Sequence, residues 1–145
     1  MQAQNYPAIL IAIQIAFLGW RINREIPLGD QGRRTWFPVS DFLNVLSMLF
    51  VVWFCIIQPL NKPMSAEPVA KLVLSIGFAL VVMHPINMIG HYRFLSPHGR
   101  HIYTVAGRDY PYITDHEWVT LVLTTLLALY VATQSELLIR LTHGT

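Results

Sequence analysis

The sequence predicts an all-α integral membrane protein with four transmembrane helices in an antiparallel bundle and both termini on the same side. Hydrophobic residues make up 54% of the 145 residues and charged residues only 12%, about half the ~25% charge of an ordinary globular chain. The charged residues cluster, which leaves four apolar segments of roughly the 20 residues that cross about 30 Å of hydrocarbon. Because lipid cannot satisfy open backbone polar groups, each segment is expected to be helical.

Prolines and charged residues set the limits of the four helices, which we expect at about 3–20, 38–58, 68–91 and 115–135. They form a single transmembrane domain over residues 1–145, with long connections at about 21–37 and 92–114. The short link between the second and third helices favours an antiparallel pair.

The distribution of cations predicts the orientation. Seven of the ten Lys and Arg residues fall in the two long connections: Arg21, Arg24, Arg33, Arg34, Arg93, Arg100 and Arg108. Basic loops are retained in the cytoplasm, so both connections should be cytoplasmic and both termini external, in the plasma (inner) membrane. Arg33 and Arg34, beside Trp36, suit anionic lipid headgroups.

Several classes of protein are excluded or disfavoured by composition. A lone cysteine, Cys55, cannot form an intrachain disulfide or a CxxC redox pair. The net charge of +2 gives no reason to expect nucleic acid as a partner. No basic residue precedes Arg21, so the first apolar segment is expected to be a retained helix and not a cleaved signal peptide.

Small residues four apart predict the faces through which the helices pack or oligomerise. The first helix carries Ala8, Ala12 and Ala16, and the fourth carries Ala128 and Ala132. If the alanines of the first helix face the bundle, Gln14 points the opposite way, toward lipid. An unsatisfied amide in hydrocarbon costs several kcal/mol, so Gln14 would then need a partner on another chain or helix.

Polar residues inside the other helices are candidates for a pore or polar cavity, since such residues face the bundle interior or a water-filled space. They recur at helical spacing on three helices: Ser40, Asn44, Ser47, His84, Asn87, Thr120 and Thr124. An interhelical hydrogen-bond network is the alternative explanation for the same pattern.

Histidines gather in and beside the half of the membrane that we expect to be cytoplasmic, and neutral imidazole binds zinc, copper and haem iron. The candidates for a metal or haem ligand are His84, His91, His98, His101 and His116. His91 and His116 form the only plausible intrachain pair of axial ligands. The alternative explanation is that these histidines are simply polar residues tolerated at the membrane surface. No cofactor is therefore assigned.

Two acidic groups suit helix ends better than catalysis. Thr114 and Glu117 have the spacing of a capping box at the start of the fourth helix. Ser40 and Asp41 suit the start of the second helix, where a negative charge is favourable. No nucleophile elbow, phosphate loop or zincin motif is present, which disfavours an enzyme.

The leading hypothesis is a non-catalytic multi-pass membrane subunit, surrounded by lipid, that assembles with copies of itself or within a larger membrane complex. The alternatives are an oligomeric channel lined by the polar residues of helices two to four, and a haem- or metal-binding membrane subunit that uses His91 and His116.

Overall fold

The structure is a computed structural model that describes residues 5–30, 37–61, 67–92 and 113–143. All regular structure in these ranges is helical. The elements are α1 (Tyr6–Asp30), α2 (Val39–Val51), the π-helix η2 (Val52–Ile57), α3 (Gln58–Asn61), α4 (Glu67–Tyr92) and α6 (Asp115–His143).

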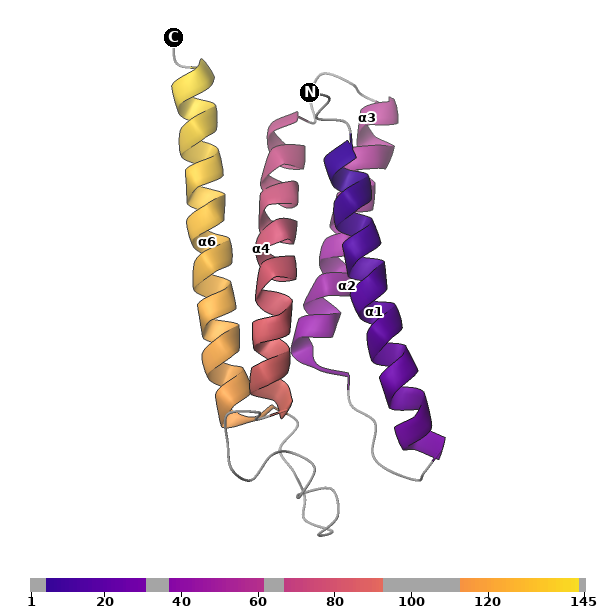
Figure 1. The fold of residues 1–145 in the computed structure, drawn as a ribbon. Coiled ribbons are helices and arrows are strands. Elements are labelled where there is room, and N and C mark those ends of the chain that lie inside the picture. Colours follow the sequence, from indigo (N-terminus) through magenta and orange to yellow (C-terminus); the bar gives the residue numbers. More distant parts are fainter. Residues whose placement is uncertain (1–4, 31–36, 62–66, 93–112, 144–145) are drawn as a thin grey trace.

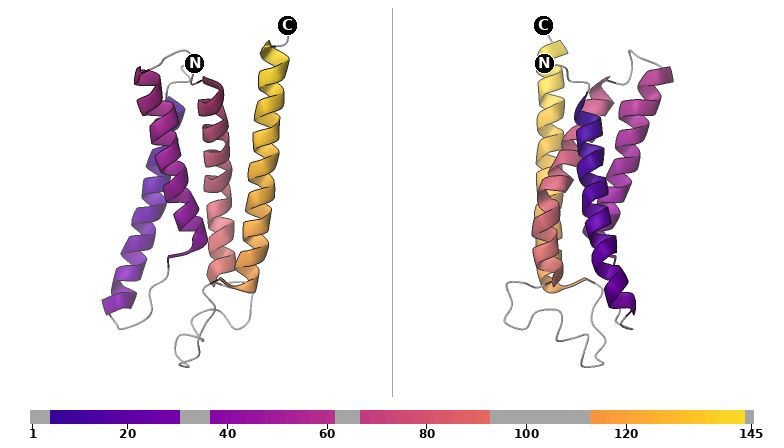
Figure 2. Two further views of the ribbon diagram at one scale, coloured as in Figure 1. Left: turned by 180° about the vertical axis from the view of Figure 1, so that it is seen from behind. Right: turned by 45° about the vertical axis from the view of Figure 1, so that its right-hand side comes forward.

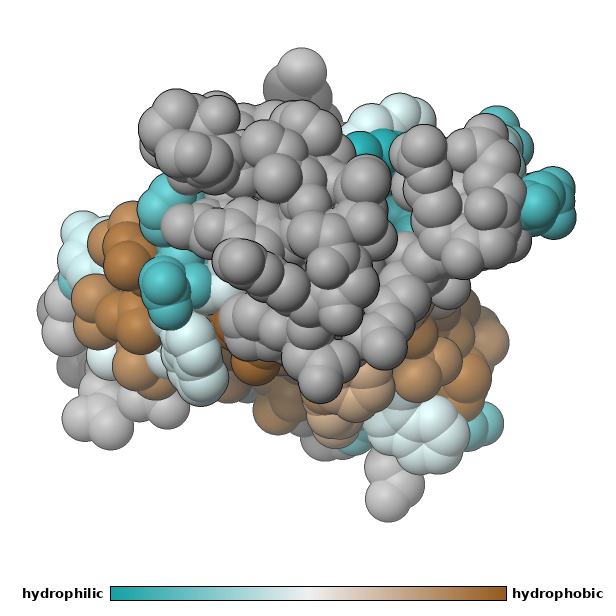
Figure 3. Space-filling view, turned by 90° about the horizontal axis from the view of Figure 1, so that it is seen from below, coloured by the Kyte–Doolittle hydropathy of each residue, from teal (hydrophilic) through white to brown (hydrophobic). Residues whose placement is uncertain are grey.

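Within the described ranges, four helical segments are long and apolar enough to cross a membrane, as the sequence predicts. They are Tyr6–Pro27, Val39–Asn61, Pro68–Tyr92 and Asp115–Ser135. Hydrophobic side chains cover both flanks of the molecule when it is seen along the helices (Figure 3). The protein is therefore a multi-pass membrane protein.

The first helix is longer than the sequence analysis predicted. The expected connection at 21–37 begins inside α1, which continues to Asp30. An ion pair between Arg21 and Glu25, one turn apart and 2.9 Å between charged atoms, lies within this extension. Arg21 and Arg24, two of the charges that suggested a loop, are therefore part of the helix.

The second span is continuous through α2, η2 and α3. In η2 the turn widens, and the N–H of Gln58 donates to the carbonyl of Trp53, five residues earlier. The widened turn directly precedes Pro59, whose ring would crowd the carbonyl of Cys55 in a regular α-helix. The π-turn thus lets the span continue past a proline.

Three of the long helices form one group, and the fourth attaches to it at the side. Helices α1, α2 and α4 contact one another, whereas α6 packs mainly on α4 (Figures 1 and 2). Gly77 permits the close approach in the group, since a Cβ there would lie 2.6 Å from Leu10 and 3.1 Å from Ser47. The expected four-helix bundle is thus a three-helix core with α6 beside it.

The core of this group has an apolar half and a polar half. Leu10, Val51 and Val81 form the buried apolar cluster. We call one end of the molecule the lower end, after its place in Figure 1; there α1 and α4 terminate and α2 and α6 begin. The buried polar residues lie between the apolar cluster and this lower end. We call one set of them the polar half-core: Gln14, Arg21, Ser40, Asp41, Asn44, Ser47 and His84.

Candidate functional site

Helix α1 presents Gln14 and Arg21 to the other helices, which is the reverse of the arrangement in which its alanines would face the bundle. Gln14 is 3% exposed, and its amide nitrogen donates to Ser47 Oγ at 3.1 Å and to the Asn44 carbonyl at 3.4 Å. Ala8, Ala12 and Ala16 are exposed on the other side. Of the two uses predicted for the alanine face, packing inside this chain does not occur, because burial of an amide and a guanidinium outweighs close packing of methyl groups. Its use as an oligomer contact stays a prediction.

Arg21 and Asp41 form an ion pair in the polar half-core. The Arg21 Nε donates to Asp41 Oδ2 at 2.9 Å, and both side chains are almost fully buried. Asp41 lies in the first turn of α2, but no side chain caps this helix and Pro38 occupies the capping position. The expected capping role of Ser40 and Asp41 is therefore corrected: Asp41 joins α2 to α1.

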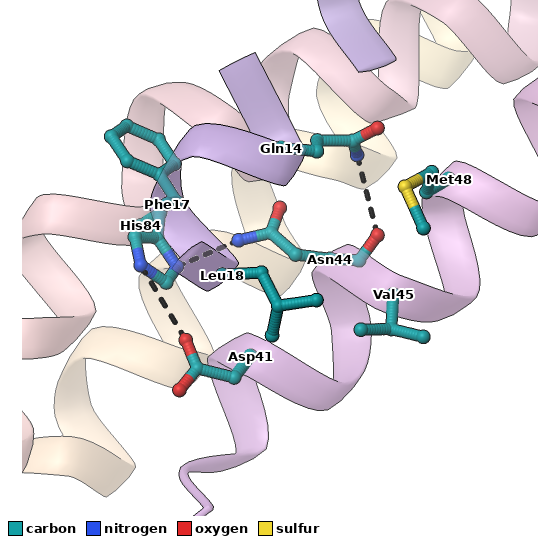
Figure 4. A pocket seen from close by; sticks show the side chains of 8 residues that line it. All are labelled: Gln14, Phe17, Leu18, Asp41, Asn44, Val45, Met48 and His84. Carbon is teal, nitrogen blue, oxygen red and sulfur yellow. Dashed lines mark hydrogen bonds and ion pairs between the residues drawn. The ribbon is translucent and has the colours of Figure 1, made fainter. Parts of the chain in front are cut away.

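His84 of α4 lies between Asp41 and Asn44. Its Nε2 is 3.5 Å from Asp41 Oδ1, and its Nδ1 is 2.6 Å from the Asn44 side-chain nitrogen (Figure 4). The ring stacks on Phe17 of α1, with centroids 4.7 Å apart. A polar chain consequently runs from Arg21 through Asp41 and His84 to Asn44 and connects α1, α4 and α2.

Charged and aromatic residues surround the polar half-core at the lower end. The Tyr92 hydroxyl donates to Glu25 at 3.2 Å, and the Arg24 guanidinium carbon lies 3.8 Å from the centroid of the Tyr92 ring. Glu25 in turn pairs with Arg21. These contacts link the buried charges to the end of α1, where side chains are only partly buried.

A small pocket opens within the polar half-core, between α1, α2 and α4. Gln14, Asp41, Asn44 and His84 line it together with apolar side chains (Figure 4). Its volume of about 10 Å³ is close to the space that one water molecule needs. Among the described residues, three buried polar atoms of the lining side chains have no hydrogen-bond partner: Gln14 Oε1, Asn44 Oδ1 and His84 Nε2.

A second set of polar contacts, the α4–α6 interface, joins these two helices at the lower end. His91 Nδ1 is 2.9 Å from Glu117 Oε2, and each side chain is 1% exposed. Asn87 and Thr124 also bond to each other, at 2.9 Å from the Asn87 nitrogen to the Thr124 oxygen. The partner of His91 within the described residues is thus a carboxylate.

The predicted capping box is confirmed. The N–H of Glu117 donates to Thr114 Oγ1 at 3.1 Å, and the N–H of Thr114 donates to Glu117 Oε2 at 3.4 Å. The Thr114 hydroxyl donates to the carbonyl of Gly90 on α4. The cap of α6 is therefore also a contact with α4, which the sequence did not indicate.

The predicted pore residues lie between helices of a single chain. Six are buried and Thr120 is partly buried. Their role as a pore lining stays a prediction. The remaining predicted packing residues, Ala128 and Ala132, are partly buried.

The predicted metal or haem ligands are distributed between two places. His84 belongs to the polar half-core, and His91 and His116 lie at the lower end of α4 and α6. Within the part of the chain that the structure describes, no three His, Cys, Asp or Glu side chains are placed to share a metal ion. His98, His101, Arg33 and Arg34 lie outside the described residues.

Arg21 is the principal site residue that the sequence analysis missed. It falls at the start of the expected connection at 21–37, yet the chain has an inward helical pattern there at spacings of four, three and four: Leu10, Gln14, Phe17 and Arg21. That spacing places them on one helical face and could have predicted the inward position of Arg21.

Comparison with family models, curated proteins and solved structures finds no match to the chain.

Proposed function

We propose that the protein is a non-catalytic membrane subunit that assembles with a second copy of itself through the exposed face of α1. We define this outer face by its five small or polar residues: Ala8, Ala12, Ala16, Gly19 and Asn23. The observation that carries the proposal is that these residues lie on the side of α1 opposite to Gln14 and Arg21.

The polar half-core fixes the rotation of α1. Turning the helix to bury its alanines would expose Gln14 and Arg21 to lipid and separate the 2.9 Å contact between Arg21 and Asp41. An uncompensated charge or amide in hydrocarbon costs more than helix packing returns. The outer face is therefore held away from the chain's own helices.

The outer face has the features of a helix–helix contact in lipid. Small residues let two backbones approach closely, and association in a membrane depends on such packing because lipid is as apolar as the side chains. At Gly19 an added Cβ would meet no atom within 4 Å among the described residues. A copy of the same chain brings an identical face, so a two-fold dimer closes without further partners.

The proposal includes an antiparallel order of the four spans, with both termini external and the connections at 31–36 and 93–112 cytoplasmic. Figure 1 supports it, since α1 begins and α6 ends at the same end of the molecule. The excess of Arg in these connections supports a cytoplasmic lower end in the plasma (inner) membrane. Lipids cover the remaining exposed apolar side chains.

Enlarging the outer face tests the assembly. In the Ala12→Leu, Ala16→Leu double variant, two side chains too large for close helix contact should shift the protein from dimer to monomer. The measurement is native mass spectrometry or cross-linking in mild detergent over a range of protein concentrations. We expect the dimer dissociation constant to rise at least about tenfold, which is about 1.4 kcal/mol.

The matched control is Val119→Leu with Val122→Leu, which enlarges two exposed residues of α6. This control should leave the dimer unchanged. A wild-type protein that is monomeric at every concentration contradicts the proposal. The wild-type protein could instead form a stable complex with a different protein that the α1 double variant does not form. That result would make the different protein, and not a second copy, the partner of the outer face.

A further inference from the structure

The polar half-core contains a histidine whose hydrogen bonds define its protonation state. If the Asn44 side-chain nitrogen donates to His84 Nδ1 at 2.6 Å, Nδ1 has no proton and Nε2 carries it. Nε2 then carries the N–H and lies 3.5 Å from Asp41 Oδ1, without a hydrogen bond to it. His84 is thus neutral, with an anionic carboxylate near the ring nitrogen that already bears a proton.

The side-chain oxygen of Asn44 has no partner among the described residues, and it offers a second way for Asn44 to hydrogen-bond the His84 ring. Asn44 is 5% exposed, and its Oδ1 has no hydrogen-bond partner within the described ranges although it lies beside the pocket (Figure 4). A half-turn of the amide would place Oδ1 where the nitrogen is now. It could then accept a hydrogen bond from a protonated Nδ1, so the number of bonds to His84 would stay the same.

We propose that His84 is a reversible proton-binding site that exchanges protons with the aqueous phase at the lower end only. A hydronium ion gives its proton to the lone pair of His84 Nδ1 and becomes water, and the Asn44 amide turns to accept the new N–H. Asp41 faces the imidazolium as well as Arg21, and Glu25 is the second carboxylate paired with Arg21. The pocket has the volume for about one water molecule, which would accept a hydrogen bond from the turned Asn44 nitrogen.

The charged groups near His84 are two arginines, which oppose an added proton, and two carboxylates, which favour it. Arg21 faces it from α1 through Asp41, and Arg24 and Glu25 lie beyond Arg21. Asp41 faces it from α2. On α4 itself the next titratable groups are His91, which is paired with Glu117 of α6, and Tyr92, which is bonded to Glu25.

Access is expected from one side because only the lower half of the core is polar. The chain from Glu25 through Arg21 and Asp41 connects His84 to the lower end. In the other direction Val51 and Leu10 are fully buried, and Val81, one turn from His84 on α4, is 8% exposed. The site therefore binds a proton without conducting it across the membrane.

Nitrogen NMR of histidine tests the site directly. The full chain, labelled with ¹⁵N-histidine, is placed in phosphatidylcholine–phosphatidylglycerol nanodiscs and examined from pH 8 to pH 5. The His84 signals are assigned by their loss in His84→Gln. We expect a neutral ring with its proton on Nε2 at pH 8 and a doubly protonated ring at pH 5.

Two substitutions at Asn44 should act in opposite directions. Asn44→Ala removes the acceptor for Nδ1–H and should abolish the doubly protonated signal at pH 5, whereas Asn44→Asp supplies a stronger acceptor and should retain that signal at pH 8. The control Asn87→Ala removes a buried amide that bonds to Thr124 instead, and should behave as wild type. A His84 ring that stays neutral down to pH 5 in the wild type, or equal behaviour of the two Asn44 variants, overturns the proposal.

A measurement of proton flux into vesicles distinguishes a proton-binding site open to one side from a proton pathway across the membrane. Vesicles of the same lipids, loaded with a pH-sensitive dye, should show no proton leak above protein-free vesicles after an external pH jump. A leak that disappears in His84→Gln would overturn the one-sided arrangement and favour a continuous channel. Neither measurement depends on assembly through α1.

Discussion

At the scale of single residues, Asp41 joins three helices. It accepts from Arg21 on α1, faces His84 on α4 and belongs to α2. Buried charges are strongly destabilising when one member of a pair is removed, because the partner remains in an apolar environment. The ion pair therefore fixes how the three helices meet, whatever its net contribution to stability.

Removal of the Asp41 charge should destabilise the protein far more than removal of an exposed one. Asp41→Asn removes the more deeply buried of the two carboxylates paired with Arg21, and we expect the free energy of unfolding to fall by about 3 kcal/mol. The control Asp115→Asn changes an exposed carboxylate in the first turn of α6, where the loss should stay below about 1 kcal/mol. Denaturation with SDS in mixed micelles measures both. Similar losses in the two variants would show that Arg21 and Asp41 are not a buried pair.

Residues with local roles could be predicted from the sequence, and residues whose roles depend on distant partners could not. The capping box of Thr114 and Glu117 requires only a spacing of three, and the structure contains it. Asp41 has the same local signature of a helix start, but its partner Arg21 lies on another helix. Nothing in the spacing around Asp41 distinguishes these two roles.

At the scale of elements, the position of α6 depends on a narrow contact with α4. A Cβ added at Gly90 would lie 2.7 Å from Thr120 Oγ1 and 2.9 Å from the His116 carbonyl oxygen. A backbone atom cannot move aside as a flexible side chain can. The glycine therefore sets the distance between the two helices and lets the bonds of the α4–α6 interface form.

Gly90→Ala should separate the lower ends of α4 and α6. Overpacking of this kind costs about 1–3 kcal/mol of unfolding free energy. The matched control is Gly19→Ala, where a Cβ meets nothing within 4 Å among the described residues, and where alanine should be neutral or stabilising by up to about 1 kcal/mol. The comparison is made at a detergent and protein concentration that keeps the chain monomeric, since Gly19 belongs to the outer face. If Gly90→Ala is as stable as the wild type, α4 and α6 lie farther apart at Gly90 than the structure shows.

The rotation of α1 shows where prediction from the sequence failed and why. Its small residues and its polar residues occupy opposite faces, and each face is a valid helix contact in lipid. The choice between them depends on Ser47 and Asp41, which lie on a different helix. Length and composition predict four spans without such information, so that part of the fold was predictable.

At the scale of the whole molecule, the rotation of α1 about its axis determines three features. They are the polar half-core, the apolar cluster and the outer face of α1. The contacts of Gln14 and Arg21 turn the alanines outward, and Leu10, on the same face as Gln14, joins the apolar cluster. The same rotation brings Phe17 onto His84. The site and the proposed assembly surface are therefore two consequences of how α1 is turned.

Thiol cross-linking between α1 and α2 tests this rotation most directly. In a Cys55→Ala background, Gln14→Cys with Ser47→Cys replaces two side chains whose polar atoms are 3.1 Å apart, and Ala12→Cys with Ser47→Cys is the control. Each variant is treated with a short bifunctional thiol reagent, and mass spectrometry detects an intrachain cross-link as a monomer that has lost both free thiols. We predict this cross-link for the Gln14 pair and none for the Ala12 pair. An intrachain cross-link for the Ala12 pair and none for the Gln14 pair would contradict the account.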